Sequence, residues 1–194
     1  KLLPTTLIIE LLSACNFLLF GVVTINLFNN AGVLAIEKVI ISLITFFTLT
    51  SLLFLSVYDI VTFLIPYNFT RNLLFLLVLL NLLVGILRFF IYQISATSFL
   101  NNVHLGYIDN LAAGIILGTL FWMIVKITKE KGMGEGDIDI VIVIGLFLGL
   151  PDSLLAIFLT LILGSILSCV YAIYVRKFRG LIVPFVPFIL LGFI

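Results

Sequence analysis

Residues Ser153–Val175 read SLLAIFLTLILGSILSCVYAIYV, a run of 23 residues without a charged side chain. An α-helix rises 1.5 Å per residue, and the hydrocarbon core of a bilayer is about 30 Å thick. An apolar run of about 20 residues is therefore what a transmembrane helix needs. This stretch predicts a helix that spans a membrane.

Six other apolar runs accompany it, and charged or turn-forming residues separate them. These runs are Leu7–Phe28, Val39–Tyr58, Asn72–Tyr92, Tyr107–Ile127, Ile138–Leu150 and Leu181–Ile194. The chain has 194 residues, is 63% hydrophobic and 10% charged, and has a mean hydropathy of +1.41. That composition excludes a soluble domain. No internal repeat or low-complexity linker divides the chain, so we expect one membrane-embedded domain over residues 1–194. Its predicted fold is all-α and polytopic, with about seven transmembrane helices.

Basic residues in the short connecting loops predict the orientation in the membrane, because such residues are retained on the cytosolic side. An N-terminus in the cytosol followed by seven spans places eight of the ten basic residues on that side and two outside. The eight are Lys1, Arg71, Lys126, Lys129, Lys131, Arg176, Lys177 and Arg179. We therefore expect an integral protein of the cytoplasmic membrane, with Asp59 and Asp137 both at the cytosolic face.

The hexapeptide Gly132-Met133-Gly134-Glu135-Gly136-Asp137 precedes the shortest apolar run, Ile138–Leu150. Glycine disfavours a helix interior, so Gly132, Gly134 and Gly136 predict a loop, with Asp137 as the N-cap of the helix. Thirteen residues reach only about 20 Å along a helix axis. We expect the loop to enter a hydrated cavity open to the cytosol, between the segments Asp59–Arg71 and Thr128–Asp137.

Two aspartates on one membrane face are candidates for catalysis. Asp59 ends the second apolar run and Asp137 begins the fifth. Two neighbouring carboxylates cannot both ionise at low cost, so one of them remains protonated. The ionised acid can then take a proton from water, and the protonated acid can polarise a carbonyl and protonate a leaving amine. This chemistry is that of an aspartic peptidase, and it requires no cofactor and no metal.

Three other acids are candidates for contact with a substrate. Glu10 lies a few residues into the first apolar run, where it either reaches the lipid headgroups or faces a substrate. Glu135 and Asp139 flank Asp137 and form either a solvated face or a negative rim that attracts a basic peptide. Both cysteines, Cys15 and Cys169, lie inside apolar runs, and the sequence has no CxxC pair. No zinc site is predicted from this pattern.

The two aspartate segments also resemble those of a known family. The hexapeptide ending at Asp137, with Gly145 and Leu148-Gly149 after it, resembles the GxGD segment of the type IV prepilin peptidases. The stretch Asp59…Ile65-Pro66-Tyr67-Asn68 is similar to the other aspartate motif of that family. Two further stretches are similar to its flanking motifs. These are Pro4…Ile9-Glu10-Leu11-Leu12 and Pro184-Phe185-Val186-Pro187-Phe188…Gly192.

The resemblance implies an intramembrane aspartic endopeptidase, with Asp59 and Asp137 as its catalytic pair. Its substrate would be a prepilin-like precursor with a short basic leader and an apolar helix, cut at the cytosolic face. Gly132, Gly134, Gly136 and Pro66 would shape the site, and Pro66 would stop the second helix. Longer family members carry an upstream helix and a zinc segment linked to N-methylation. These 194 residues contain neither, so the resemblance does not extend to methyltransferase activity.

Three alternative interpretations remain open at this point. A presenilin-like protease is suggested by Tyr58-Asp59, although its Pro-Ala-Leu motif is not found in the sequence. A small transporter would use the two aspartates to relay protons or bind a cation. An inactive structural relative would tolerate Asp139 where family members usually carry Lys or Val. No feature of the sequence predicts nucleic-acid binding.

Overall fold

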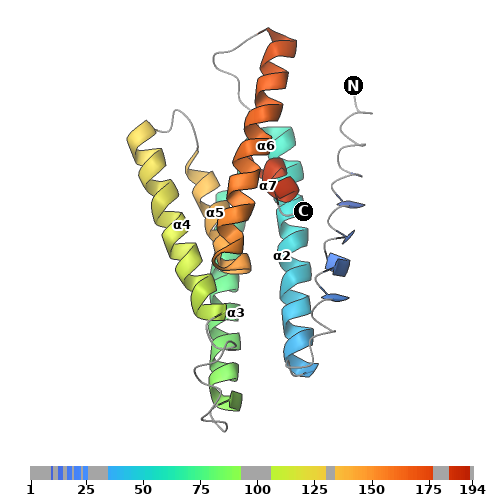
Figure 1. Cartoon of the computed structure of the whole chain (residues 1–194), viewed down its shortest axis with the longest axis vertical. Coiled ribbons are helices and arrows are strands. Elements are labelled where there is room, and N and C mark those ends of the chain that lie inside the picture. Colours follow the sequence, from blue (N-terminus) through green and yellow to red (C-terminus); the bar gives the residue numbers. More distant parts are fainter. Residues whose placement is uncertain are drawn as a thin grey trace. The chain divides into compact units, whose positions relative to one another are not determined.

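The computed structural model describes most of the predicted helical runs. The described residues are 10, 13–14, 17–18, 20–22, 24–25, 35–92, 106–129, 134–176 and 184–192. Six helices are delimited in them: α2 (Ala35–Thr62), α3 (Tyr67–Tyr92), α4 (Gly106–Thr128), α5 (Glu135–Leu148), α6 (Asp152–Val175) and α7 (Val186–Gly192) (Figure 1). No strand occurs in the described part of the chain. The predicted all-α class is confirmed.

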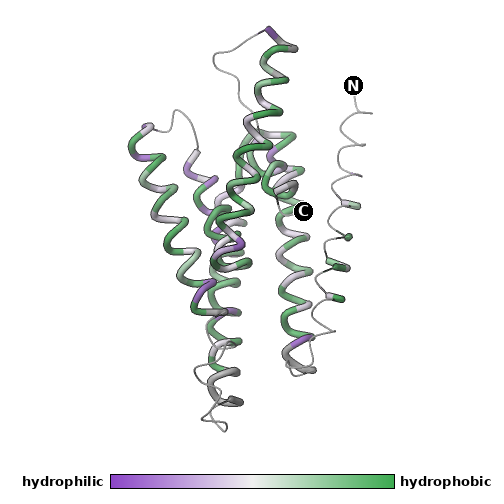
Figure 2. Tube along the Cα trace, in the orientation of Figure 1, coloured by the Kyte–Doolittle hydropathy of each residue, from purple (hydrophilic) through white to green (hydrophobic). Residues whose placement is uncertain are grey.

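Four of the helices are long and apolar enough to cross a membrane: Lys38–Thr62, Tyr67–Ile86, Ile108–Thr128 and Asp152–Val170. Their mean hydropathy lies between 1.9 and 2.5, and apolar residues run along their length in Figure 2. Helix α5, with 14 residues, is as short as predicted, and α7 has only seven. The first predicted run, Leu7–Phe28, lies largely outside the described residues. The total of about seven spans therefore stays a prediction.

The end of α2 lies further along the chain than the sequence predicted. The apolar run was expected to end at Tyr58, with Asp59 at its boundary, but the helix continues to Thr62. The backbone N–H of Phe63 donates to the carbonyl of Asp59 at 2.8 Å, and Phe63 then takes a positive φ of 53° that ends the helix. Asp59 thus lies inside the last turn of α2.

Pro66 lies between α2 and α3. Helix α2 ends at Thr62, four residues before Pro66, and the role of the proline in stopping it stays a prediction. The carbonyl of Pro66 accepts hydrogen bonds from the N–H groups of Phe69, at 3.0 Å, and Thr70, at 3.1 Å. Pro66 therefore stands immediately before α3 and opens its first turn. Proline suits a helix start because its fixed φ is close to the helical value.

The chain divides into two compact units. The first comprises Lys1–Ile65 with Ala156–Ile194, and the second comprises Pro66–Leu155. Asp59 belongs to the first unit and Asp137 to the second. The expectation of one membrane-embedded domain stays a prediction.

The second unit is built on a close approach of α4 to α5. A Cβ atom on Gly145 would lie 2.7 Å from the backbone nitrogen of Gly114, and one on Gly118 would lie 2.7 Å from Cγ1 of Ile142. Small residues let helix backbones approach closely in membrane proteins. The other side of α5 packs on α3, where the Asn81 amide donates to the carbonyl of Leu146 at 3.1 Å. This packing fixes where α5 begins relative to α3 and α4.

The first unit places the short helix α7 on α2. Val186 and Ile189 of α7 are buried, as are Leu52 and Leu55 of α2. A Cβ on Gly192 would lie 2.7 Å from the carbonyl oxygen of Ala156, so α7 also lies against α6. Helix α7 is too short to span a bilayer, and it brings the segment around Pro184 to the end of α2.

Candidate active site

Asp59 is a buried acid with a specific partner. It is 6% exposed, and its Oδ2 accepts a hydrogen bond from the backbone N–H of Val186 at 3.1 Å. Val186 is the first residue of α7, within the Pro184–Phe188 motif. Burying a carboxylate is costly unless hydrogen bonds compensate, so this bond stabilises and orients the side chain. Two stretches that the sequence separates by more than a hundred residues therefore meet in the first unit.

Ser56 is a residue near Asp59 that the sequence analysis did not identify. It is fully buried, and its Oγ atom has no hydrogen-bond partner among the residues that the structure describes. Residues three apart lie on one face of a helix, so Ser56 shares the face of α2 that carries Asp59. A buried polar atom without a partner is uncommon. The sequence offers only the spacing of three residues between Ser56 and Asp59 as a signal. This spacing is too common to identify Ser56 unless its burial is known.

The sequence predicted Asp137 as the N-cap of α5, and the structure shows that this prediction was wrong. The N-cap is Gly134, and Asp137 is the third residue of the helix. The carboxylate Oδ2 of Asp137 accepts the N–H of Gly134 at 3.1 Å, and the N–H of Asp137 donates to the carbonyl of Gly134 at 3.2 Å. An acid at this position satisfies a free N–H of the helix start and interacts favourably with its positive end.

The glycine segment is more helical than predicted. Helix α5 begins at Glu135, so Glu135, Gly136 and Asp137 form its first turn instead of a loop. Gly134 has a φ of −80°, which residues other than glycine readily adopt. The helix forms because its first turn tolerates glycine and favours acids. Gly132 and Met133 lie outside the described residues.

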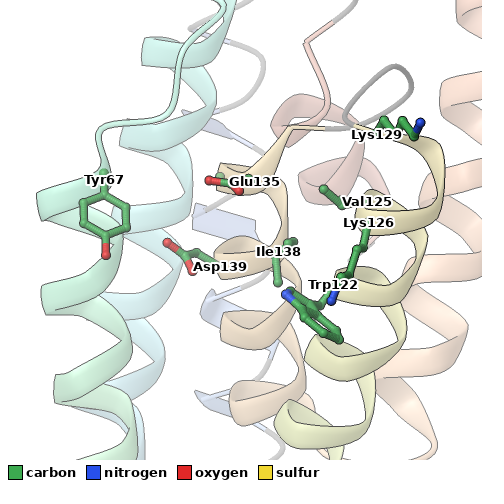
Figure 3. A pocket seen from close by; sticks show the side chains of 9 residues that line it. Tyr67, Trp122, Val125, Lys126, Lys129, Glu135, Ile138 and Asp139 are labelled. Atoms are coloured by element: carbon green, nitrogen blue, oxygen red, sulfur yellow. The ribbon is translucent and has the colours of Figure 1, made fainter.

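A pocket of about 550 Å³ lies beside this first turn, and we call it the charged pocket (Figure 3). It is lined by Tyr67 of α3, by Trp122, Val125 and Lys126 of α4, by Lys129, and by Glu135, Gly136, Ile138 and Asp139 of α5. The sequence predicted a cavity between Asp59–Arg71 and Thr128–Asp137, and both segments contribute to the lining. Asp137 itself is not a lining residue. The opening of the pocket to the cytosol stays a prediction.

The two acids that flank Asp137 both line the charged pocket. Glu135 is exposed, whereas Asp139 is partly buried and its Oδ2 accepts a hydrogen bond from the hydroxyl of Thr70 at 3.2 Å. Thr70 is fully buried on α3. The spacing of four residues places both acids on one face of α5. Glu10, the third predicted substrate-facing acid, is exposed and belongs to the first compact unit.

Two lysines, Lys126 of α4 and Lys129 just after it, line the charged pocket. The Nζ atom of Lys126 lies 4.5 Å from the centroid of the Trp122 ring, a cation–π contact. Lys129 follows the end of α4 with a positive φ of 52°. In Figure 3 the carboxylates of Glu135 and Asp139 point toward Tyr67 of α3, whereas Lys126 and Lys129 lie on the α4 side of α5. The pocket thus presents both signs of charge to whatever it binds.

A metal site finds no support in the described ranges. No group of three or more His, Cys, Asp or Glu side chains in them could hold a metal ion.

Residues 46–169, nearly two thirds of the chain, match the type IV leader peptidase family. The chain belongs to the type IV leader peptidase family. The matched stretch contains Asp59, Asp137 and all the residues of the charged pocket. This finding confirms the resemblance described from the sequence.

A relative with a described function is a prepilin leader peptidase/N-methyltransferase of Xanthomonas campestris pv. campestris. It is 27% identical over 75 residues, which are 39% of this chain and 26% of the relative. The match thus spans about a quarter of the relative's length. No solved structure matches the chain.

Proposed function

We propose that this protein is an intramembrane aspartic endopeptidase that removes the short basic leader of type IV prepilin-like precursors. The observation that carries the proposal is the environment of Asp59. An acid that is 6% exposed within an apolar helix is costly, and such acids in membrane segments are usually functional. The family match, which spans both Asp59 and Asp137, supports assigning peptidase chemistry to it.

In the proposed reaction, Asp59 and Asp137 act as the catalytic pair, with one carboxyl group protonated and the other ionised. The ionised carboxylate takes a proton from a water molecule, whose oxygen attacks the carbonyl carbon of the scissile peptide bond. The protonated carboxylate stabilises the developing oxyanion by donating a hydrogen bond. The tetrahedral intermediate then breaks its C–N bond, and the leaving amine receives a proton from the pair. No covalent intermediate with the protein forms.

The charge around α5 suits a basic leader. Glu135 and Asp139 lie on the turn that carries Asp137, and Glu10 is an exposed acid of the first unit. Their negative field would attract a lysine- or arginine-containing leader from solution. The leader would be cut at the cytosolic face, since the basic loop residues favour an orientation with both aspartates on that side. We propose accordingly a single domain in the cytoplasmic membrane with about seven spans.

A cleavage assay tests the proposal directly. The purified chain is reconstituted in liposomes with synthetic prepilin-like precursors, and leader removal is followed by mass spectrometry. We expect hydrolysis of one peptide bond between the basic leader and the apolar helix. Asp152, an exposed acid at the start of α6, provides a matched control, and its substitution by Asn should preserve turnover. Failure to cleave any precursor with a basic leader and an apolar helix would refute the proposal.

A further inference from the structure

A second cavity, of about 520 Å³, adjoins the charged pocket, and we call it the apolar groove. Its walls include Val78 of α3, Ile115 and Gly118 of α4, and Ile142 and Leu146 of α5. Trp122 and Ile138 line both cavities, so the groove and the pocket meet at these two side chains, and we call the two together the depression. One part of this depression is apolar, and the other carries charges of both signs. Its occupant must therefore be amphiphilic.

The size of the apolar groove limits what it can hold. Its walls come from three helices that contact one another, and α4 lies close to α5 because Gly118 has no side chain. Near Val78 and Leu111, α3 and α4 are joined by a hydrogen bond from the Asn110 amide to the side-chain oxygen of Asn81 at 3.2 Å. A helix with its side chains is about 10–12 Å wide and rises about 5.4 Å per turn, so a volume of about 520 Å³ holds only about one turn of it. A single acyl chain is much thinner and fits such a volume along its length.

The charged pocket favours a head group that carries both signs of charge. Lys126 and Lys129 would bind a phosphate, but an anionic head group alone would also meet Glu135 and Asp139. A primary ammonium beside the phosphate removes that repulsion, because it can donate hydrogen bonds to the two carboxylates. Charge complementarity therefore selects a head group with a phosphate and a primary ammonium.

The junction of the two cavities resembles a membrane–water interface. Trp122, which is half exposed, and Lys126, stacked on its ring, occupy this junction on α4. Tryptophan is enriched at the headgroup level of bilayers, and lysine extends its charge toward the water while its stem remains in apolar surroundings. The lining of the depression thus changes from apolar to charged at Trp122, as a lipid changes from its acyl chains to its head group.

We propose that the apolar groove and the charged pocket together bind one phospholipid with a primary ammonium in its head group. An acyl chain lies in the groove, the phosphate lies toward Lys126 and Lys129, and the ammonium lies toward Glu135 and Asp139. Such a head group has no net charge, so it leaves intact the long-range attraction of a basic leader. The lipid site is independent of proteolysis and can be tested without a cleavage assay.

Binding of the phospholipid can be tested by the fluorescence of Trp122, because it is the only tryptophan of the sequence. Lipids with brominated acyl chains quench tryptophan on contact. The full chain is reconstituted with brominated phosphatidylethanolamine, phosphatidylcholine or phosphatidylglycerol at equal fractions in a non-brominated phosphatidylcholine host. We expect phosphatidylethanolamine to associate with Trp122 about two- to fivefold more strongly than either of the others, the size of one exposed charge contact. Equal quenching by the three lipids, or a preference for phosphatidylglycerol, would overturn the proposal.

Glu135→Gln tests the assignment of the head group. This variant should lose the preference for phosphatidylethanolamine while quenching by brominated phosphatidylcholine stays unchanged, which shows that the groove is intact. Asp152→Asn, at an exposed acid outside both cavities, should keep the preference. Retention of the preference by Glu135→Gln would contradict the proposal. So would relief of the quenching by a prepilin-like peptide, because the depression would then belong to the substrate.

Discussion

The Asp59 carboxylate is bonded to the backbone N–H of Val186, 127 positions later in the chain, at 3.1 Å. Only proline lacks a backbone N–H, so this donor is present with any other residue at position 186. Helix α7 supplies a fixed N–H at the end of α2.

Val186→Pro should reduce cleavage strongly, because proline removes this N–H yet is well tolerated in the first position of a helix. A hydrogen bond to a charged group contributes about 1.5–3 kcal/mol, so we expect kcat/KM to fall by about ten- to a hundredfold. Val186→Ala is the control, since it retains the N–H and loses only packing. Turnover by Val186→Pro equal to that of Val186→Ala would show that the bond does not serve catalysis.

The two aspartates should behave as one catalytic unit. Asp59→Asn and Asp137→Asn each remove an ionisable proton site, so either should abolish leader removal while membrane insertion is preserved. Because the residues act together, the double variant should be little slower than either single variant. Residual turnover of each variant is measured by mass spectrometry of the released leader. Additive losses in the double variant would argue against a shared proton.

The glycines of α4 and α5 should matter more for stability than Gly134. Gly145→Ala places a Cβ within 2.7 Å of the Gly114 backbone, which forces the two helices apart. We expect a loss of about 1–3 kcal/mol in unfolding free energy, typical of overpacking. In Gly134→Ala the new Cβ meets only the Asp137 carboxylate, at 3.8 Å, so little change is expected. Thermal unfolding in detergent, followed by circular dichroism, compares the two, and equal losses would contradict the packing argument.

Gly136→Val should impair cleavage without removing any catalytic atom. Gly136 lines the charged pocket within the first turn of α5, next to Asp137. A β-branched side chain is restricted in a helix, so it should disturb the turn that positions Asp137. Leader removal by this variant measures the effect, with the helical content as a check on folding. Normal cleavage would mean that this turn tolerates a β-branched residue beside Asp137.

The Thr70–Asp139 hydrogen bond should couple α3 to the start of α5. Thr70→Val removes the hydroxyl that donates to Asp139 at 3.2 Å. In a double-mutant cycle with Asp139→Ala, we expect a coupling of about 0.5–1.5 kcal/mol in unfolding free energy. The measurement is chemical unfolding of the four proteins in detergent. A coupling near zero would mean that the bond contributes nothing to holding these helices together.

The helices themselves were largely predictable from the sequence. The apolar run Ser153–Val175 became α6, which begins only one residue earlier, and Tyr107–Ile127 became α4 with one residue added at each end. The shortness of the apolar run Ile138–Leu150 also predicted that α5 would be a short helix. Such runs are predictable because membrane insertion depends on local length and apolarity, which neighbouring residues determine by themselves.

The immediate environment of each aspartate was decided by the tertiary structure. The sequence identified Asp59 and Asp137 as candidates, but it placed one at a helix boundary and the other at an N-cap. The contact of Asp59 with Val186, and the packing of Gly145 against Gly114, join residues that are distant in the chain. Local composition carries no information about such pairs, because they form only when separate helices pack. The sequence by itself determined a helical membrane protein with two candidate acids, and packing between helices decided what holds Asp59 and which residues line the pocket beside Asp137.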